Sequence, residues 1–302
     1  GFLGSNLCRR LLEDGHKVLC LDDLSTGKFS NVLELEKNPL FTFINHDLTK
    51  AFFPDKLDAI FNLASPASPV HYQYNPIRTL KMGTLAIYNI LGMATRMNIP
   101  ILQASTSEVY GDPLVHPQKE SYWGNVNPIG PRACYDEGKR VAESLCIAYK
   151  QHNGVSIRIA RIFNTYGPFM DPKDGRVVSN FITQALQGKK LTVYGDGKQT
   201  RSFCYVSDLI DGLIKLMDSD IEVPVNLGNP DEYQMLDLVE SVRNISGKNT
   251  EIVFKELPID DPQRRCPNIS RAKALLNWSP KVSLEDGLKL TVEWFKKALK
   301  SK

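Results

Sequence analysis

Short apolar runs alternate with helical patterns through the first half of the chain. Five runs, rich in β-branched and aliphatic residues and bounded by polar residues, predict β-strands. They lie at 17–22, 41–45, 58–64, 100–105 and 155–163. Helical periodicity occupies the intervening residues 2–14, 76–97 and 134–150. This alternation predicts an α/β fold with a Rossmann-type doubly wound parallel sheet.

The pattern changes after about residue 166. Turns rich in Gly, Pro and Asp interrupt shorter elements, and a final helix is predicted at 284–300 with Ser283 as its N-cap. We therefore expect a Rossmann domain at 1–166 and a smaller C-terminal substrate-binding region at 167–302. Some return to the first domain is expected near 203–217.

The chain opens with GFLGSNL, where Gly1 and Gly4 have the spacing of the last two glycines of a dinucleotide fingerprint. Asp22 ends the next predicted strand, where an acid binds a ribose diol and repels a 2′-phosphate, so NAD is favoured over NADP. The first strand and the first glycine of such a unit are missing from the sequence. We expect an unfilled position between strands 17–22 and 58–64, and a chain that is a fragment of a longer enzyme.

Tyr135 and Lys139 stand four residues apart in the predicted helix 134–150, so they share one face. A phenol beside an ammonium makes an acid/base unit, because the cation favours phenolate and should lower the tyrosine pKa. The spacing alone also occurs by chance on helix surfaces. The upstream run TSEVYGD (106–112) adds the hydroxyls and the carboxylate that such a site needs.

Composition narrows the function classes. Hydrophobic residues make up 42% and charged residues 24%, and no apolar run approaches the roughly 18 residues of a membrane span. The net charge of +3, without a basic block, argues against a nucleic-acid partner. Six scattered cysteines and histidines without ligand spacing predict neither a metal site nor disulfides, and favour the cytoplasm. Because residue 1 is not Met, a lost leader or membrane anchor stays open.

Longer motifs resemble the extended short-chain dehydrogenase/reductases that act on nucleotide sugars, most closely the subgroup that decarboxylates UDP-glucuronate. They are ASPASP (64–69), ASTSEVYGD (104–112), YWGNVNPIGPRACYDEGKR (122–140), RIFNTYGP (161–168), DGRVVSNFI (174–182), LTVYGDGKQTR (191–201) and DDPQRR (260–265). The resemblance covers essentially the whole chain. It implies NAD-dependent conversion of UDP-glucuronate to UDP-xylose and CO₂ through a 4-keto intermediate, with the cofactor recycled.

The resemblance also implies roles residue by residue, with no metal among them. The cofactor-binding residues would be Gly1, Phe2, Leu3, Gly4, Asp22, Asp23, Asp47, Leu63, Ala64, Tyr135 and Lys139. The catalytic residues would be Thr106, Ser107, Glu108, Tyr135, Lys139 and Arg265. The substrate-binding residues would be Ser107, Glu108, Asn164, Val178, Tyr194, Arg201 and Arg265. Gly83 stands where relatives commonly carry Asn, so we expect looser packing of helix 76–97 or a more loosely held water near the site.

Several alternatives stay open at this point. Glu108 could destabilise the substrate carboxylate or handle a proton or water. Arg265 could bind diphosphate, or act at the sugar carboxylate or C5. Other nucleotide-sugar chemistry would make the chain a 4,6-dehydratase, a 4-epimerase or a decarboxylase that stops at the 4-keto pentose; an inactive binding subunit is the fourth possibility. A homodimer is expected because relatives pair two such helices, here carrying apolar residues beyond one stripe: Ile87, Ile90, Met93, Val141, Leu145 and Ile147.

Overall fold

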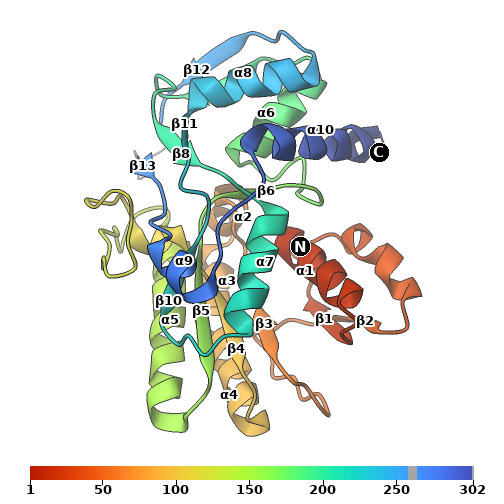
Figure 1. Cartoon of the computed structure of the whole chain (residues 1–302), viewed down its shortest axis with the longest axis vertical. Coiled ribbons are helices and arrows are strands. Elements are labelled where there is room, and N and C mark those ends of the chain that lie inside the picture. Colours follow the sequence, from red (N-terminus) through yellow and green to blue (C-terminus); the bar gives the residue numbers. More distant parts are fainter. Residues whose placement is uncertain (258–263, 301–302) are drawn as a thin grey trace.

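The computed structural model describes residues 1–257 and 264–300. Of the motif 260–265, only Arg264 and Arg265 therefore fall within the described residues. A four-stranded parallel sheet, in the order β10-β5-β4-β3, forms the centre of the lower half of the molecule in Figure 1. Its strands are β3 (Ile60–Asn62), β4 (Ile101–Thr106), β5 (Ile157–Ile162) and β10 (Pro224–Leu227).

Helices cover both faces of this sheet, as in a doubly wound fold. Successive residues of a strand point to opposite faces. Ile101 of β4 packs into a core cluster with helices α4 (Ile87–Met97) and α5 (Ala133–Asn153). Its neighbour Leu102 joins the main core cluster, where α7 (Val206–Met217) covers the other face. The predicted α/β class and the five predicted strands are confirmed.

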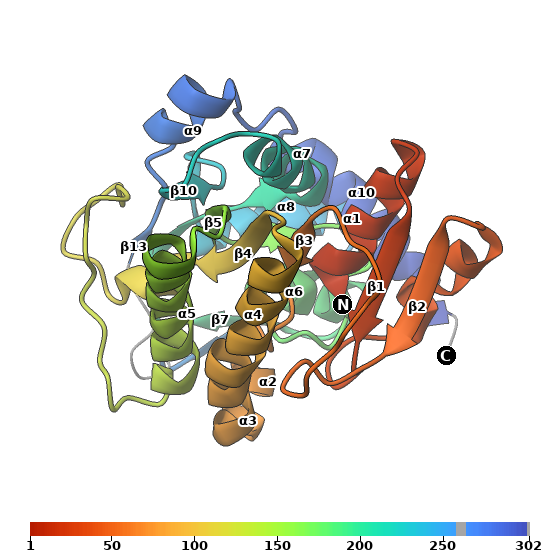
Figure 2. The same cartoon turned by 90° about the horizontal axis from the view of Figure 1, so that it is seen from below.

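The remaining two predicted strands form a separate parallel pair. These are β1 (Val18–Asp22) and β2 (Phe41–Asn45), which stand apart from β3 and β4 in Figure 2. In the described part of the chain no strand lies between β1 and β3, the position expected to be unfilled. A cavity of about 1360 Å³ occupies this region, and it is lined by apolar side chains from both sides of the gap. They include Leu7, Leu21, Ile60, Ile90 and Met217.

The predicted helix 76–97 is a succession of three segments: α3 (Pro76–Lys81), a π-helical turn η3 (Met82–Ala86) and α4. A Cβ placed on Gly83 would lie 2.6 Å from the carbonyl oxygen of Gly138 in α5. Gly83 therefore permits close packing of η3 on α5, and the expectation of looser packing was wrong. The expected dimer residues Ile87 and Ile90 are also corrected, because both are buried in the core of their own chain.

The upper half of Figure 1 holds most of the C-terminal part. Its elements are α6 (Val177–Leu186), β7 (Leu191–Tyr194), β8 (Thr200–Ser202), β11 (Glu232–Gln234), α8 (Met235–Ser246), β12 (Ile252–Lys255), β13 (Arg264–Arg265) and α10 (Leu284–Lys300). Strand β8 lies between β11 and β13, and β7 pairs with β12. The short strands β6 (Thr165–Tyr166) and β9 (Cys204–Tyr205) pair with each other.

The chain returns to the central sheet after residue 203, because α7 packs on β4 and β5, and β10 extends the sheet beside β5. The division at residue 166 itself stays a prediction.

The other helices are α1 (Phe2–Glu13), α2 (Pro69–Tyr74) and α9 (Ser270–Leu276), with 3₁₀ turns at η1 (Phe29–Asn31), η2 (Leu33–Lys37) and η4 (Ser107–Tyr110). None of the helices described is both long enough and apolar enough to cross a bilayer.

Candidate active site

Helix α5 carries Tyr135 and Lys139 on the face that it turns toward β4. Both side chains are buried, and the Lys139 ammonium donates a hydrogen bond of 2.8 Å to the carbonyl oxygen of Ala104. Its Nζ lies 5.7 Å from the centre of the Tyr135 ring. The i,i+4 spacing therefore does bring the phenol and the ammonium together in a buried site.

Burial dominates the protonation of both groups. It raises the pKa of Tyr135 to about 12, although a hydrogen bond with the Thr106 hydroxyl lowers it in part. Burial also lowers the pKa of Lys139 to about 8, because a desolvated ammonium is disfavoured. The expectation of a tyrosine pKa lowered toward neutrality was wrong, because burial outweighs the groups that lower it. The phenol is therefore protonated near neutral pH, and a positive charge brought beside it would lower its pKa.

Strand β4 ends at Thr106, and the turn η4 that follows presents Ser107 and Glu108 beside Tyr135. Arg265, 2% exposed, reaches this turn from β13 and donates from Nη1 to Ser107 Oγ at 2.9 Å. The same guanidinium contacts Glu108 Oε1 at 2.8 Å and the carbonyl oxygen of Gly111 at 3.1 Å. Arg132 donates to Glu108 Oε2 at 2.6 Å from the other side.

The two arginines decide the charge of Glu108. Burial alone would raise the pKa of this carboxyl, but Arg265 and Arg132 outweigh it and hold the pKa at about 2. Glu108 is therefore ionised at neutral pH. Its carboxylate holds both guanidinium groups at this turn. Two arginines here can attract an anionic substrate group, which argues against the alternative in which Glu108 repels a carboxylate.

Sequence reasoning missed two groups that complete the site. Asp136 is 6% exposed, and burial together with Glu108 raises its pKa to about 7. Tyr72 of α2 stacks on Tyr135 with 5.0 Å between ring centres. Within the described residues, Asp136 Oδ1 and the Tyr72 hydroxyl are buried without a hydrogen-bond partner. Asp136 could have been found from the sequence, because it directly follows Tyr135. No local sequence pattern indicates Tyr72.

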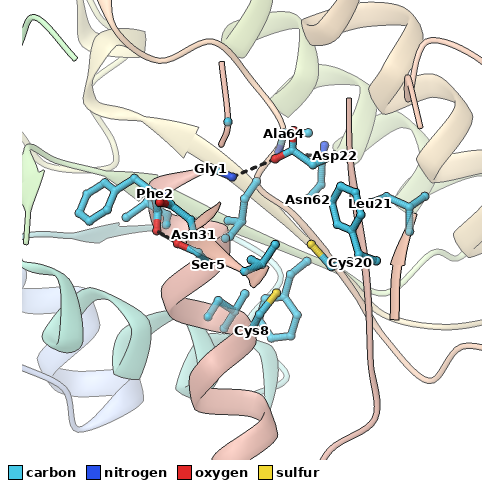
Figure 3. A pocket seen from close by; sticks show the side chains of 18 of the residues that line it. Gly1, Phe2, Ser5, Cys8, Cys20, Leu21, Asp22, Asn31, Asn62 and Ala64 are labelled. Carbon is cyan, nitrogen blue, oxygen red and sulfur yellow. Dashed lines mark hydrogen bonds and ion pairs between the residues drawn. The ribbon is translucent and has the colours of Figure 1, made fainter. Parts of the chain in front are cut away.

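Eight of the eleven expected cofactor residues line the cavity between β1 and β3. Figure 3 shows Gly1 at the start of α1 facing Asp22, whose Oδ2 lies 2.9 Å from the Gly1 nitrogen. A helix N-terminus beside an acid at a strand end is the arrangement that binds a dinucleotide pyrophosphate and ribose. Most of the predicted set lines the same cavity: Gly1, Phe2, Leu3, Gly4, Asp22, Asp23, Leu63 and Ala64.

Asp47 is connected to the cavity lining through Arg78. Its carboxylate accepts hydrogen bonds from the Thr49 backbone and hydroxyl, and lies 4.0 Å from Arg78. Arg78 also pairs with Asp23, so a cation that the sequence analysis did not single out links the two acids.

The buried polar groups fit NAD. Of the three N–H donors of the Lys139 ammonium, the described residues engage one, at Ala104, which leaves donors for ribose hydroxyls beside Tyr135. The cavity exceeds the roughly 300–1,000 Å³ of an ordinary ligand pocket because it continues from the nucleotide rim into the gap in the sheet.

The expected substrate residues divide into two groups. Arg201 and Arg265 are register partners on β8 and β13. The Arg265 guanidinium contacts Ser107 and Glu108, the residues expected to face the sugar. Tyr194 is 40% exposed at the end of β7. Asn164 is half-buried and its backbone carbonyl accepts from Cys204. The Val178 side chain is buried in the main core, so only its backbone N–H in the first turn of α6 is available.

Residues 1–228 match the model of the NAD dependent epimerase/dehydratase family. The chain belongs to this family. It is 55% identical to UDP-glucuronic acid decarboxylase 1 of Xenopus tropicalis, over 99% of this chain and 71% of the relative. It is 52% identical to UDP-glucuronic acid decarboxylase 6 of Arabidopsis thaliana, over 98% of this chain and 86% of the relative.

Solved structures of other members of the NAD dependent epimerase/dehydratase family share the fold. The UDP-glucose 4-epimerase of Thermotoga maritima, solved with UDP-glucose, matches with a TM-score of 0.89 at 28% identity over 99% of this chain and 97% of that one. The UDP-glucuronic acid 4-epimerase of Bacillus cereus, solved with UDP-glucuronic acid and NAD, matches with a TM-score of 0.88, the same identity and the same coverage.

Proposed function

We propose that this chain decarboxylates UDP-glucuronate to UDP-xylose through a 4-keto intermediate, with NAD recycled within each turnover. The observation that carries the proposal is the pairing of two groups of residues in one site. An oxidation unit, Thr106, Tyr135 and Lys139, adjoins a cluster in which two arginines contact Glu108. Identity above 50% to named UDP-glucuronic acid decarboxylases over nearly the whole chain supports it.

Tyr135 accepts the C4 hydroxyl proton in its phenolate form, which the positive charge of NAD⁺ would favour, and Thr106 forms a hydrogen bond with its phenolic oxygen. NAD, when bound, supplies the acceptor for the C4 hydride and returns that hydride at the end of the reaction. Oxidation makes C4 a ketone β to the carboxylate. The C5–CO₂ bond then breaks, its electron pair forms an enolate, and a proton adds at C5. Tyr135, now protonated and of high pKa, donates to the O4 oxyanion and so stabilises the enolate.

The cluster around Glu108 acts at the other end of the sugar. Its arginines attract and orient the substrate carboxylate, and Glu108 fixes their positions. Because the pKa of Glu108 is about 2, this carboxylate does not carry a proton at neutral pH and does not donate one to C5. Asp136, with a pKa of about 7, is a carboxyl of the same site that does exchange a proton in the neutral range.

Mass spectrometry of the products from UDP-glucuronate and NAD⁺ tests the reaction class. A UDP-pentose with the mass of UDP-xylose, together with CO₂, is expected. Epimerisation is the second candidate, because the two similar solved structures described above are UDP-sugar 4-epimerases. It would leave the mass of UDP-glucuronate unchanged, and that result would reject decarboxylation.

We also propose a homodimer formed through α3, η3, α4 and α5. These helices expose large apolar side chains, namely Ile77, Leu80, Leu85, Tyr88 and Val141. Burying them against a second copy would remove this surface from water. Light scattering at micromolar concentration should give the mass of two chains; the mass of one chain would reject the pairing. A reducing compartment such as the cytoplasm suits the six cysteines, which are all free thiols.

A further inference from the structure

Three metal-ligating side chains from distant parts of the sequence meet behind Arg265. His116 Nε2 lies 2.8 Å from Glu232 Oε2, and Cys266 completes the group. The three ligand atoms all lie within 4.8 Å of one another. Because the residues come from three separate segments, no spacing in the sequence indicates a metal site. The expectation of a chain without a metal site was based on spacing alone and did not consider this cluster.

Backbone pairing holds these segments together. β8 lies between β11 and β13, so that Glu232 opposes Ser202, and Arg265, the residue before Cys266, opposes Arg201. The loop that carries His116 is attached through Gln118. Its backbone nitrogen donates to the Cys266 carbonyl at 2.9 Å, and its Oε1 accepts from the Cys266 nitrogen at 2.8 Å. The three ligands are therefore positioned by the fold rather than by chance contact of mobile side chains.

The Glu232 carboxylate is oriented as metal-binding carboxylates are. Thr200 Oγ1 donates to its Oε1 at 2.7 Å, which leaves Oε2 directed at His116. Such outer hydrogen bonds fix the geometry of a metal ligand. Cys266 is 2% exposed, whereas the side chains of His116 and Glu232 are 28% and 26% exposed. An ion thus has a buried sulfur at the base of the site and a path from solvent.

We propose that His116, Glu232 and Cys266 bind a divalent transition metal of the zinc class, with a fourth position open to water. One imidazole nitrogen, one thiolate and one carboxylate suit Zn²⁺, whereas Mg²⁺ and Ca²⁺ prefer oxygen ligands alone. Zinc bonds of about 2.0–2.3 Å set ligand atoms roughly 3.5 Å apart, so small side-chain shifts complete the site. Binding displaces the thiol proton that Cys266 shares with the carbonyl of Pro230 at 3.2 Å.

Co²⁺ is the probe, because a thiolate ligand gives it a charge-transfer band in the near ultraviolet. The full chain, reduced and freed of metal by a chelator, should bind one Co²⁺ with this band and with visible bands of tetrahedral intensity. Zn²⁺ should displace them. Cys266→Ser should abolish the charge-transfer band, and Thr200→Val should weaken Co²⁺ binding about 10- to 100-fold through loss of the outer hydrogen bond.

His116→Gln changes an exposed side chain, so it tests the site even if Cys266→Ser fails to fold. It removes one of three ligands and should weaken Co²⁺ binding at least about tenfold. Cys204→Ser is the matched control, since Cys204 is a buried thiol outside this cluster, and it should keep the full spectrum. The proposal is overturned if Co²⁺ fails to bind stoichiometrically. It is equally overturned if the charge-transfer band survives both Cys266→Ser and His116→Gln. Loss of the band in Cys20→Ser, a variant of a cysteine outside the cluster, would also overturn it.

Discussion

Arg265 Nη1 lies 2.8 Å from Glu108 Oε1, although the two residues are 157 positions apart in the sequence. This contact joins the turn after β4 to β13 and places a buried guanidinium beside the Tyr135 site. It explains why Glu108 is ionised, and it makes the carboxylate an organiser of positive charge rather than a proton donor.

Glu108→Gln should disturb both stability and decarboxylation. Loss of the carboxylate leaves Arg265 buried without its counter-charge, which costs about 3 kcal/mol of unfolding free energy. Decarboxylation should suffer more than hydride transfer, so bound NADH or a 4-keto hexuronate should accumulate in single-turnover experiments. Glu137→Gln is the control, because Glu137 pairs loosely with Arg140 at 3.6 Å on the helix surface. Equal slowing of every step by Glu108→Gln would contradict the assigned role.

Tyr135→Phe should lower kcat about 10²- to 10⁴-fold, because it removes the general base while keeping the ring stacked on Tyr72. NAD affinity should change little, since the Lys139 ammonium and the rim at Asp22 are untouched. Steady-state kinetics and NAD titration check both statements, with Tyr74→Phe, an exposed tyrosine, as the control. Near-normal turnover by the variant would assign the base to another group.

Asp136→Asn should change how stability depends on pH. The folded pKa of about 7 lies above the ordinary aspartate pKa of 3.8, so the folded protein holds the proton more tightly than the unfolded chain. The contribution of the protonated Asp136 carboxyl to the free energy of unfolding is complete below pH 3.8 and is lost as pH rises toward 7. Wild type should therefore lose unfolding free energy between about pH 4 and 7 relative to the variant. Urea unfolding across this window, with the exposed Asp55→Asn as the control, measures the difference; parallel curves for Asp136→Asn and wild type would contradict it.

Gly83→Ala should destabilise the protein by about 1–3 kcal/mol, because the new Cβ meets the Gly138 backbone at 2.6 Å. Gly92→Ala is its matched control in α4, where a Cβ has open space and alanine should stabilise the helix by up to about 1 kcal/mol. Thermal unfolding should therefore shift in opposite directions for the two variants. A neutral Gly83→Ala would show that η3 and α5 tolerate a wider separation.

Local patterns were sufficient for the elements and for part of the site. Strand β4 and helix α5 are marked by their own apolar periodicity, and Thr106, Tyr135 and Lys139 follow from their positions on them. Local patterns did not predict which residues from distant segments meet in the folded chain. The arginine that completes Glu108 comes from β13, and the His116, Glu232 and Cys266 cluster comes from three segments.

The pKa of Tyr135 shows a second limit. Its neighbour Lys139 was visible in the sequence, but the burial that raises the tyrosine pKa is a property of the packed core. Charge proximity can be inferred from spacing along a helix, whereas desolvation depends on everything that packs around the group.

Hydride recycling is the central claim, and a substrate deuterated at C4 tests it most directly. The enzyme with NAD⁺ should convert UDP-[4-²H]glucuronate to UDP-xylose that retains deuterium at C4, without net formation of NADH or its deuterated form. Mass spectrometry of the product and absorbance of the reduced cofactor give both quantities from one reaction. A 4-keto pentose product with one equivalent of deuterated NADH released per turnover would contradict the account.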